Sequence, residues 1–117
     1  MSQRVSAQDT VKAVLARLDD MKAEDTVTID LNGKSSIADF MVVTTGRSQR
    51  HVASVADHVI EELEKFGRVR VEGKQQGDWV LIDAGDVIVH VFRQEVRAFY
   101  NLEKMWSGRG GDERKPS

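Results

Sequence analysis

The sequence predicts one α/β domain in which a mixed five-stranded sheet carries packed helices, in the order α-β-β-α-β-β-β-α. Three observations lead to this prediction. Two segments place apolar residues at the spacing of an amphipathic helix, and several shorter segments are alternately or continuously apolar, as strands are. The last two apolar segments flank Asp83-Ala84-Gly85-Asp86, a composition typical of a hairpin connection.

The two long helices have start signals as well as apolar stripes. Ser6 can cap the first helix, with Asp9 in its positively polarised first turn. Ser48 can cap the second helix after the turn at residues 44–48. The apolar stripes consist of Val11, Val14, Leu15, Leu18 and Met21 in the first helix, and of Val52, Val55, Ala56, Val59, Ile60, Leu63 and Phe66 in the second.

The strands differ in their apolar pattern, and this difference predicts their surroundings. Residues 25–31 alternate between apolar and polar side chains, which indicates a strand with one wet face near a sheet edge. Residues 40–45 are continuously apolar or β-branched, which indicates a strand covered on both faces. Residues 68–72 alternate again and predict another half-exposed strand. Residues 32–36 and 73–77 are expected to be loops.

The hairpin consists of residues 79–82 and 87–92, and Gly85 can adopt the positive φ that closes the connection. A short amphipathic helix is expected to follow, with one face formed by Val96, Phe99, Leu102 and Trp106. Residues 107–117 hold no apolar residue and the only proline, so we expect a disordered tail. The domain is therefore expected to span residues 1–106.

Composition narrows the class of protein. The chain has 117 residues and a net charge of −2, with 17 basic and 19 acidic side chains. This balance gives no general attraction to nucleic acid or to anionic membranes, so any RNA contact would have to be local. The absence of cysteine excludes disulfides and thiolate metal sites. The first ten residues lack the apolar core of a signal peptide, and a cytoplasmic protein is the default expectation.

The segment Thr44-Thr45-Gly46-Arg47-Ser48 admits two interpretations. A strand, a glycine turn and a helix N-terminus can bind phosphate, and Arg47 and Arg50 lie beside it. However, neither of the established phosphate-loop motifs, GxGxxG and GxxxxGK followed by Ser or Thr, is present. A plain strand-to-helix turn capped by Ser48 explains the segment as well.

The carboxylates and histidines give weak signals for catalysis. Asp78, Asp83 and Asp86 could be a metal or acid–base cluster, but Asp83 and Asp86 flank a turn, where aspartate commonly binds nearby backbone N–H groups. A two-metal transferase would instead place carboxylates on alternate residues of one strand. The histidines His51, His58 and His90 lack the spacing of a zinc site. His90 shares a sheet face with Ile88 and Phe92, where a hydrogen-bonded structural histidine is the commoner case.

Both tryptophans, the only tyrosine and two of the four phenylalanines fall within residues 77–106. Trp79 and Leu81 have one strand parity, and Val80 and Ile82 have the other, so only one pair can face the main core. Val80 and Ile82 are the better core candidates. Trp79 is then either covered by the C-terminal helix or part of a surface that binds a protein partner.

Two blocks of sequence resemble the ribosomal silencing factor, or Iojap, family. They are ADFMVVTTGRSQRHVASVADHVIEEL and GDWVLIDAGDVIVHVFRQEVRAFYNLEKMW. The resemblance spans about residues 8–106, and the second block is specific, because GDWVLID, GDVIVHVF and EVRAFYNLEKMW occur in order with unbroken spacing.

The resemblance implies a translational repressor that binds the large ribosomal subunit at its ribosomal protein fourteen and blocks joining of the small subunit. It implies a nucleotidyltransferase-like fold without enzymatic activity, no cofactor or metal, no membrane partner, and a homodimer off the ribosome. The positions carried over as partner-binding candidates are Trp79, Asp83, His90, Phe92, Glu95, Arg97, Tyr100 and Glu103.

The candidate residues would have different roles. The aromatic residues Trp79, Phe92 and Tyr100 would supply apolar area, and Asp83, Glu95 and Glu103 would meet basic side chains and set the orientation of binding. His90 and Arg97 could instead be buried hydrogen-bonding residues that hold the surface together.

Two other functions compete with this one. A small metal-dependent nucleotidyltransferase would use Asp83 and Asp86 with the turn at residues 44–48. An RNA-binding module would use the arginines Arg47, Arg50, Arg68 and Arg70 and would lose affinity steeply with salt. The sequence lacks the basic stripes interleaved with aromatic residues that such a module needs.

Overall fold

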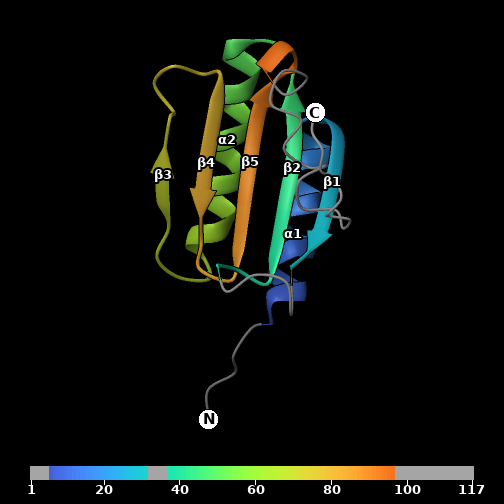
Figure 1. The fold of residues 1–117 in the computed structure, drawn as a ribbon, viewed down its shortest axis with the longest axis vertical. Helices are drawn as coiled ribbons and strands as arrows, with labels where there is room; N and C mark the ends of the chain where they lie inside the picture. The colour runs from blue at the N-terminus through green and yellow to red at the C-terminus, as the bar shows by residue number, and fades with distance from the viewer. Residues whose placement is uncertain (1–5, 32–36, 97–117) are drawn as a thin grey trace, which may run out of the picture.

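In the computed structural model, residues 6–31 and 37–96 are described, and they form two helices and five strands (Figure 1). The elements in chain order are α1 (Ala7–Asp20), β1 (Glu24–Asp30), β2 (Phe40–Gly46), α2 (Gln49–Glu64), β3 (Arg70–Glu72), β4 (Trp79–Asp83) and β5 (Val87–Arg93). Residues 94–96 begin a further helical turn. Most of the expected C-terminal helix, the loop expected at residues 32–36 and the expected tail lie outside the described residues.

The strands form one sheet in the order β1-β2-β5-β4-β3. The pairing of β2 with β5 is parallel, and the other three pairings are antiparallel. The predicted mixed five-stranded sheet is therefore confirmed. The edge position expected for residues 25–31 is confirmed too, since β1 lies at one end of the order.

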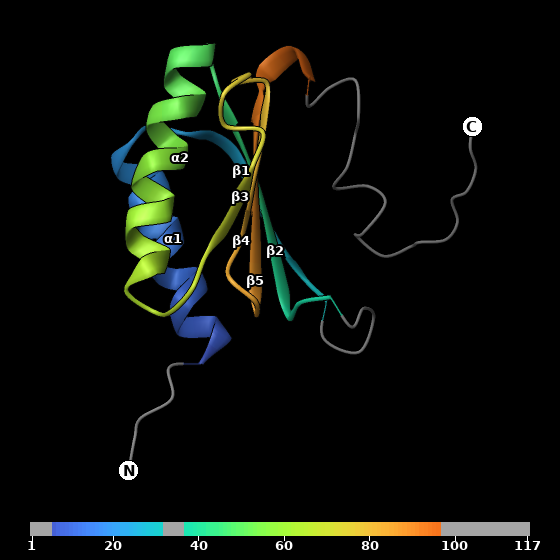
Figure 2. The same cartoon turned by 90° about the vertical axis from the view of Figure 1, so that its left-hand side faces the viewer.

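Both helices pack against the same face of the sheet (Figure 2). Their apolar stripes meet the side chains of alternate strand positions in the larger core. Val80 and Ile82 lie there without exposed surface, as their strand parity predicts. The helix residues of this core include Val14 and Leu18 of α1 and Val55 and Val59 of α2, all essentially unexposed.

A second apolar cluster lies on the sheet face turned away from the helices. Its buried members are Ile29, Leu31, Ala38, Met41, Val43, Ile88 and Phe92. Trp79, Leu81 and Val96 pack against this cluster and keep part of their surface exposed. Both faces of β2 and β5 are buried, which explains the long apolar and β-branched runs in these strands, whereas the edge strands β1 and β3 are mostly exposed.

Both predicted N-caps are confirmed. The Ser6 Oγ accepts a hydrogen bond from the Asp9 amide at 3.1 Å, and the Ser48 Oγ accepts one from the His51 amide at 3.1 Å. Between β2 and α2 the chain turns at Gly46, where a Cβ atom would lie 2.7 Å from the Val52 Cγ2. The glycine therefore allows the end of β2 to approach the first turn of α2. These contacts explain residues 44–48 as a strand-to-helix turn.

No helix within residues 6–31 and 37–96 is long and apolar enough to cross a membrane.

Candidate partner-binding surface

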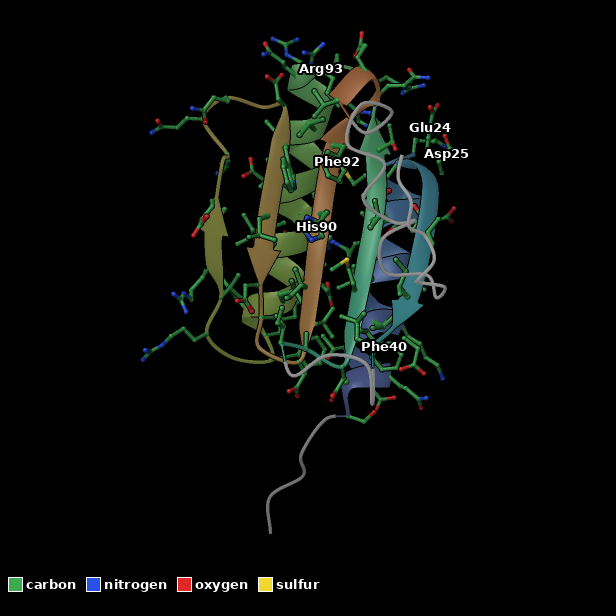
Figure 3. All side chains as sticks on the ribbon, in the orientation of Figure 1. Glu24, Asp25, Phe40, His90, Phe92 and Arg93 are labelled. Carbon is green, nitrogen blue, oxygen red and sulfur yellow. The ribbon has the colours of Figure 1, made fainter. Side chains whose placement is uncertain are left out.

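The β4–β5 register brings three of the candidate residues together. Trp79 pairs with Phe92 and Leu81 pairs with His90, so all four side chains share the sheet face away from the helices. Figure 3 looks onto this face and shows His90 and Phe92 along β5. We call Trp79, His90 and Phe92 the aromatic patch.

The three rings of the aromatic patch contact one another. The ring centroids of Trp79 and Phe92 are 4.8 Å apart, and those of Trp79 and His90 are 5.8 Å apart. The His90 and Phe92 rings are almost parallel, with centroids at 5.9 Å and an interplanar angle of 9°. These separations fall in the range at which aromatic pairs add stability beyond the burial of their area.

A hydrogen bond fixes two of these rings to each other. The Trp79 Nε1–H donates to the His90 Nδ1 at 2.9 Å. Because an indole nitrogen can only donate, the His90 Nδ1 carries no proton, and a neutral His90 holds its proton on Nε2. Burial lowers the pKa of His90 from 6.5 to about 4, because the low-polarity surroundings disfavour the charged ring. His90 is therefore neutral at pH 7, as the hydrogen bond requires.

The members of the patch differ in exposure. Phe92 is fully buried and His90 is 7% exposed, whereas Trp79 is half-buried. Trp79 is thus the member of the patch that keeps part of its surface exposed. Phe92 and His90 lie beside Trp79 on the same sheet face and contact its ring.

Asp83 lies apart from the aromatic patch, at the other end of β4. Four residue steps of a strand separate Asp83 from Trp79, or about 13 Å. The Asp83 Oδ1 accepts a hydrogen bond from the Gly85 amide at 2.8 Å, and Gly85 has a φ of +91°. The structure therefore supports the interpretation of Asp83 as a turn residue.

Glu95 lies just beyond the Trp79 end of the hairpin, with its side chain 71% exposed. Its Oε1 accepts a hydrogen bond from the Arg93 Nη1 at 3.1 Å, and the Arg93 Nε donates to the Asp78 Oδ1 at 2.9 Å. The sequence analysis missed Arg93 and its pairing with Asp78. The sequence carries no direct signal for this pairing, because only the register that pairs Trp79 with Phe92 brings Asp78 next to Arg93.

Arg97, Tyr100 and Glu103, the other three candidates, lie outside the described residues.

The remaining histidines have structural partners. The His51 Nδ1 accepts from the Arg47 amide at 2.9 Å, and its Nε2 lies 2.9 Å from the Met21 carbonyl oxygen. His51 thus joins the end of α1 to the start of α2. The His58 Nδ1 lies 3.1 Å from the Arg17 Nη2. Within the described part of the chain, no three His, Cys, Asp or Glu side chains gather as metal ligands.

The arginines of the RNA-binding hypothesis do not form one stripe. Arg47 and Arg50 lie at the N-terminal end of α2, whereas Arg68 and Arg70 follow its C-terminal end. A helix of 16 residues separates the two pairs by about 24 Å (Figure 2). The four exposed side chains therefore give two separate basic sites and no continuous track for a nucleic-acid backbone.

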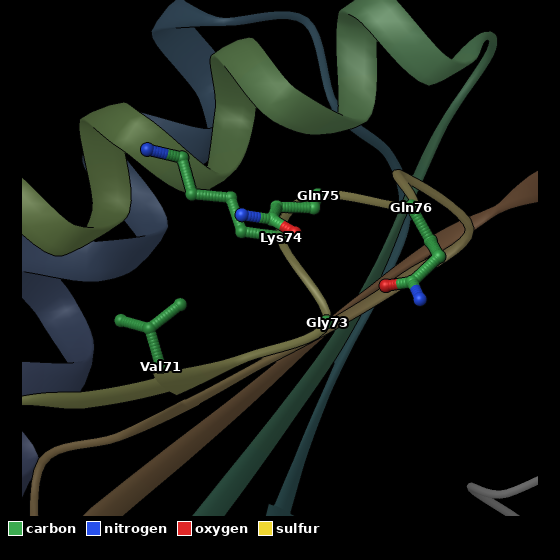
Figure 4. A pocket seen from close by; sticks show the side chains of 5 residues that line it. All are labelled: Val71, Gly73, Lys74, Gln75 and Gln76. Carbon is green, nitrogen blue, oxygen red and sulfur yellow. The ribbon is translucent and has the colours of Figure 1, made fainter.

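An open hollow of about 570 Å³ lies beside the loop between β3 and β4 (Figure 4). Its lining consists of Val71, Gly73, Lys74, Gln75 and Gln76. The Lys74 Nζ forms an ion pair with the Asp57 Oδ1 at 2.5 Å, so its charge is directed to α2. The hollow shares no residue with the aromatic patch.

By its fold and its aromatic patch, this is a small α/β protein with a half-buried tryptophan on the sheet face opposite α1 and α2. Comparisons with known proteins identify its family. A family model described as "Ribosomal silencing factor during starvation" matches residues 4–116. The chain belongs to the ribosomal silencing factor family, whose members are not enzymes. The resemblance carried by the sequence blocks is thus confirmed.

Individual relatives agree with this assignment. The chain is 49% identical to the ribosomal silencing factor RsfS of Zymomonas mobilis over 91% of its own length and 80% of the relative's. A crystal structure of a protein from Chromobacterium violaceum superposes with a TM-score of 0.85 at 36% identity, covering 97% of this chain and 92% of that one. A mouse protein named "Mitochondrial assembly of ribosomal large subunit protein 1" is 25% identical over 96% of this chain and 51% of its own length.

Proposed function

We propose that this protein binds the large ribosomal subunit at its ribosomal protein fourteen through the surface around Trp79, and that it blocks joining of the small subunit. Membership of the silencing factor family supports the ribosomal target, and the mouse relative's name refers to the large subunit. The observation that carries the choice of surface is the half-buried Trp79 on the sheet face turned away from α1 and α2. Tryptophan is enriched among the residues that dominate binding energy in protein interfaces.

The proposed mechanism is steric and uses no cofactor. A bound domain occupies the surface on which the small subunit would dock, so its presence alone lowers the number of joined ribosomes. The net charge of −2 suits a basic ribosomal protein better than bare RNA. Glu95, with its exposed carboxylate beside the Trp79 end of the hairpin, would orient the protein during the encounter.

The candidate residues divide into those that would contact the partner and those that would hold the contacting residues in place. Trp79 and Glu95 are exposed enough to touch a partner, whereas His90 and Phe92 act through Trp79. Asp83 would reach only a partner surface that extends along β4 to the hairpin turn. Among the candidates beyond the described residues, Tyr100 and Glu103 keep their proposed contact roles, and Arg97 remains either a contact or a buried hydrogen-bonding residue. We also expect a cytoplasmic protein that forms a homodimer when it is off the ribosome.

The test is co-sedimentation with purified ribosomal subunits in sucrose gradients, comparing the wild-type protein with Trp79→Ala. A matched control is Phe66→Ala, which also removes a partly exposed aromatic ring, 38% exposed and just beyond the end of α2. Circular dichroism confirms that both variants are folded at the temperature used. We expect the wild type and Phe66→Ala to travel with the large subunit and to reduce subunit joining, and Trp79→Ala to remain at the top.

The proposal fails in two distinguishable ways. If the wild type travels with neither subunit, the ribosomal target is wrong. If Trp79→Ala is folded and travels with the large subunit as the wild type does, the target holds but the binding surface lies elsewhere. A binding experiment with isolated ribosomal protein fourteen decides whether that protein is the binding partner on the large subunit.

A further inference from the structure

The Trp79–His90 hydrogen bond determines which part of the indole is left for a partner. Nε1 is the only polar atom of a tryptophan side chain, and here it donates to a histidine that is only 7% exposed. Apart from this bonded nitrogen, the half-buried Trp79 side chain consists of carbon. A partner that contacts the Trp79 side chain therefore meets apolar carbon atoms, because the indole N–H is already bonded to His90.

We propose that His90 is a positioning residue for binding, which holds the Trp79 indole in one orientation so that its carbon edge, and not its N–H, meets an apolar site on the partner. This inference rests on the proposed function, because it assumes that Trp79 contacts the large subunit. It adds the chemistry of the contact and a role for a residue that does not touch the partner.

The geometry restrains the indole from two directions. The Trp79 Nε1 donates to the His90 Nδ1 at 2.9 Å, and the Phe92 ring packs against the indole from the neighbouring strand, with centroids 4.8 Å apart. Phe92 is itself fixed, because it is fully buried and stacks on His90. A tryptophan held in this way loses little further side-chain freedom on binding, whereas a mobile one would have to be ordered by the partner.

His90 suits this role because the imidazole offers an acceptor within an otherwise apolar cluster. Its described neighbours across the strands are Leu81 on β4 and Val43 on β2, neither of which can accept a hydrogen bond through its side chain. An apolar residue at position 90 would pack in the same space but would leave the indole N–H without this acceptor. The N–H could then turn outward and present a donor to the partner.

Three variants separate the role in positioning from a role in packing. His90→Leu removes the acceptor and keeps an apolar side chain of comparable size. His90→Asn keeps an oxygen acceptor close to the place of Nδ1. Ile88→Val trims the same buried face two residues away and leaves the hydrogen bond intact, so it controls for a general loss of stability. All are compared at a temperature at which circular dichroism shows each variant to be folded.

The first readout is the indole N–H signal in a ¹⁵N–¹H spectrum of the free protein, assigned by its disappearance in Trp79→Phe. We expect His90→Leu to move this signal and to increase its rate of exchange with water. His90→Asn and Ile88→Val should keep it protected. An unchanged, protected signal in His90→Leu would overturn the proposal, because His90 would then not hold the indole.

The second readout is the affinity for purified large subunits. Without this acceptor the indole has to be ordered on binding, which costs a factor of about 2–12 in affinity, so we expect His90→Leu to bind about 3–10-fold more weakly and His90→Asn to recover most of the loss. Ile88→Val should bind as the wild type does. Equal affinities of wild type and His90→Leu, with an altered indole signal, would overturn the positioning role.

Trp79→Ala distinguishes this failure from failure of the proposed function. If folded Trp79→Ala binds the large subunit with wild-type affinity, the proposed surface is wrong, and the positioning inference falls with it. If Trp79→Ala loses at least about 30-fold in affinity, as an interface hot spot does, while His90→Leu loses none, only the positioning inference fails.

Discussion

Asp78 and Arg93 are joined twice at the end of the β4–β5 hairpin that lies away from its turn. The Arg93 amide donates to the Asp78 carbonyl oxygen at 2.8 Å, and the Arg93 Nε donates to the Asp78 Oδ1 at 2.9 Å. The Trp79–Phe92 pair is next in the ladder. The double link therefore closes the hairpin beside the aromatic patch, where fraying of the strands would release Trp79.

We expect Asp78→Asn to lower the free energy of unfolding by about 0.5–1 kcal/mol, because it removes the charge from a partly shielded ion pair and keeps the shape of the side chain. The side chains of this pair are 29% and 44% exposed. Urea denaturation measures the change. Asp57→Asn is the matched control, because its ion pair with Lys74 is more open to solvent, at 47% and 55% exposure. A loss as large in Asp57→Asn would show that the Asp78–Arg93 pair has no special role.

The stability of the protein should fall in acid through His90. Burial lowers the pKa of His90 from 6.5 to about 4, so between these pH values the unfolded chain binds a proton at this residue that the folded chain does not bind. The contribution of His90 is complete above pH 6.5 and is lost as the pH falls toward 4. One pKa unit corresponds to about 1.4 kcal/mol, so the full loss is on the order of 3 kcal/mol.

Urea denaturation at a series of pH values measures this dependence, and His90→Asn isolates it from the carboxylates. The wild-type curve should fall more steeply than the His90→Asn curve between pH 6.5 and 4. Parallel curves would show that His90 titrates alike in the folded and unfolded states, contrary to its burial beside Trp79 and Phe92.

The close approach of β2 and α2 predicts that Gly46→Ala destabilises the protein. A Cβ at this position would lie 2.7 Å from the Val52 Cγ2 and 2.9 Å from the Val52 amide nitrogen. The strand or the helix would have to shift, which in a packed interior costs about 1–3 kcal/mol. Thermal denaturation measures the loss.

The double variant Gly46→Ala/Val52→Ala separates the two contacts. Removing the Val52 methyl groups relieves the side-chain clash and leaves the clash with the backbone nitrogen. We expect a coupling between the two substitutions that offsets part of the Gly46→Ala loss. Strictly additive effects would mean that the helix moves as a whole and that the Val52 side chain is not the obstacle.

Local patterns were sufficient to predict most of the fold. Caps such as Ser48, the apolar stripes of α1 and α2, and the glycine turn at Gly85 are set by neighbouring residues, so they can be read along the chain. The parity of Val80 and Ile82 also predicted which side of β4 faces the helices. The strand order was not predicted, because pairing of β2 with β5 joins segments more than forty residues apart in the sequence.

The candidate site was predicted less completely than the fold. The sequence motif named Trp79, His90 and Phe92 together, but only the register shows that their rings touch, and it places Asp83 at the far end of the strand. The distribution of Arg47, Arg50, Arg68 and Arg70 about the two ends of α2 likewise became visible only in the folded chain.

By itself the sequence determined the fold class, the family and the secondary structure of the described residues, because each depends on local patterns or on motifs carried in order along the chain. The tertiary structure decided the exposure of Trp79, the acceptor role of His90 and the double link between Asp78 and Arg93. These features depend on which side chains the sheet brings opposite one another and on how far water reaches them. The access of water depends on how the whole chain packs. Burial of His90 in surroundings of low polarity keeps its imidazole neutral, and the neutral ring can accept the hydrogen bond from the indole.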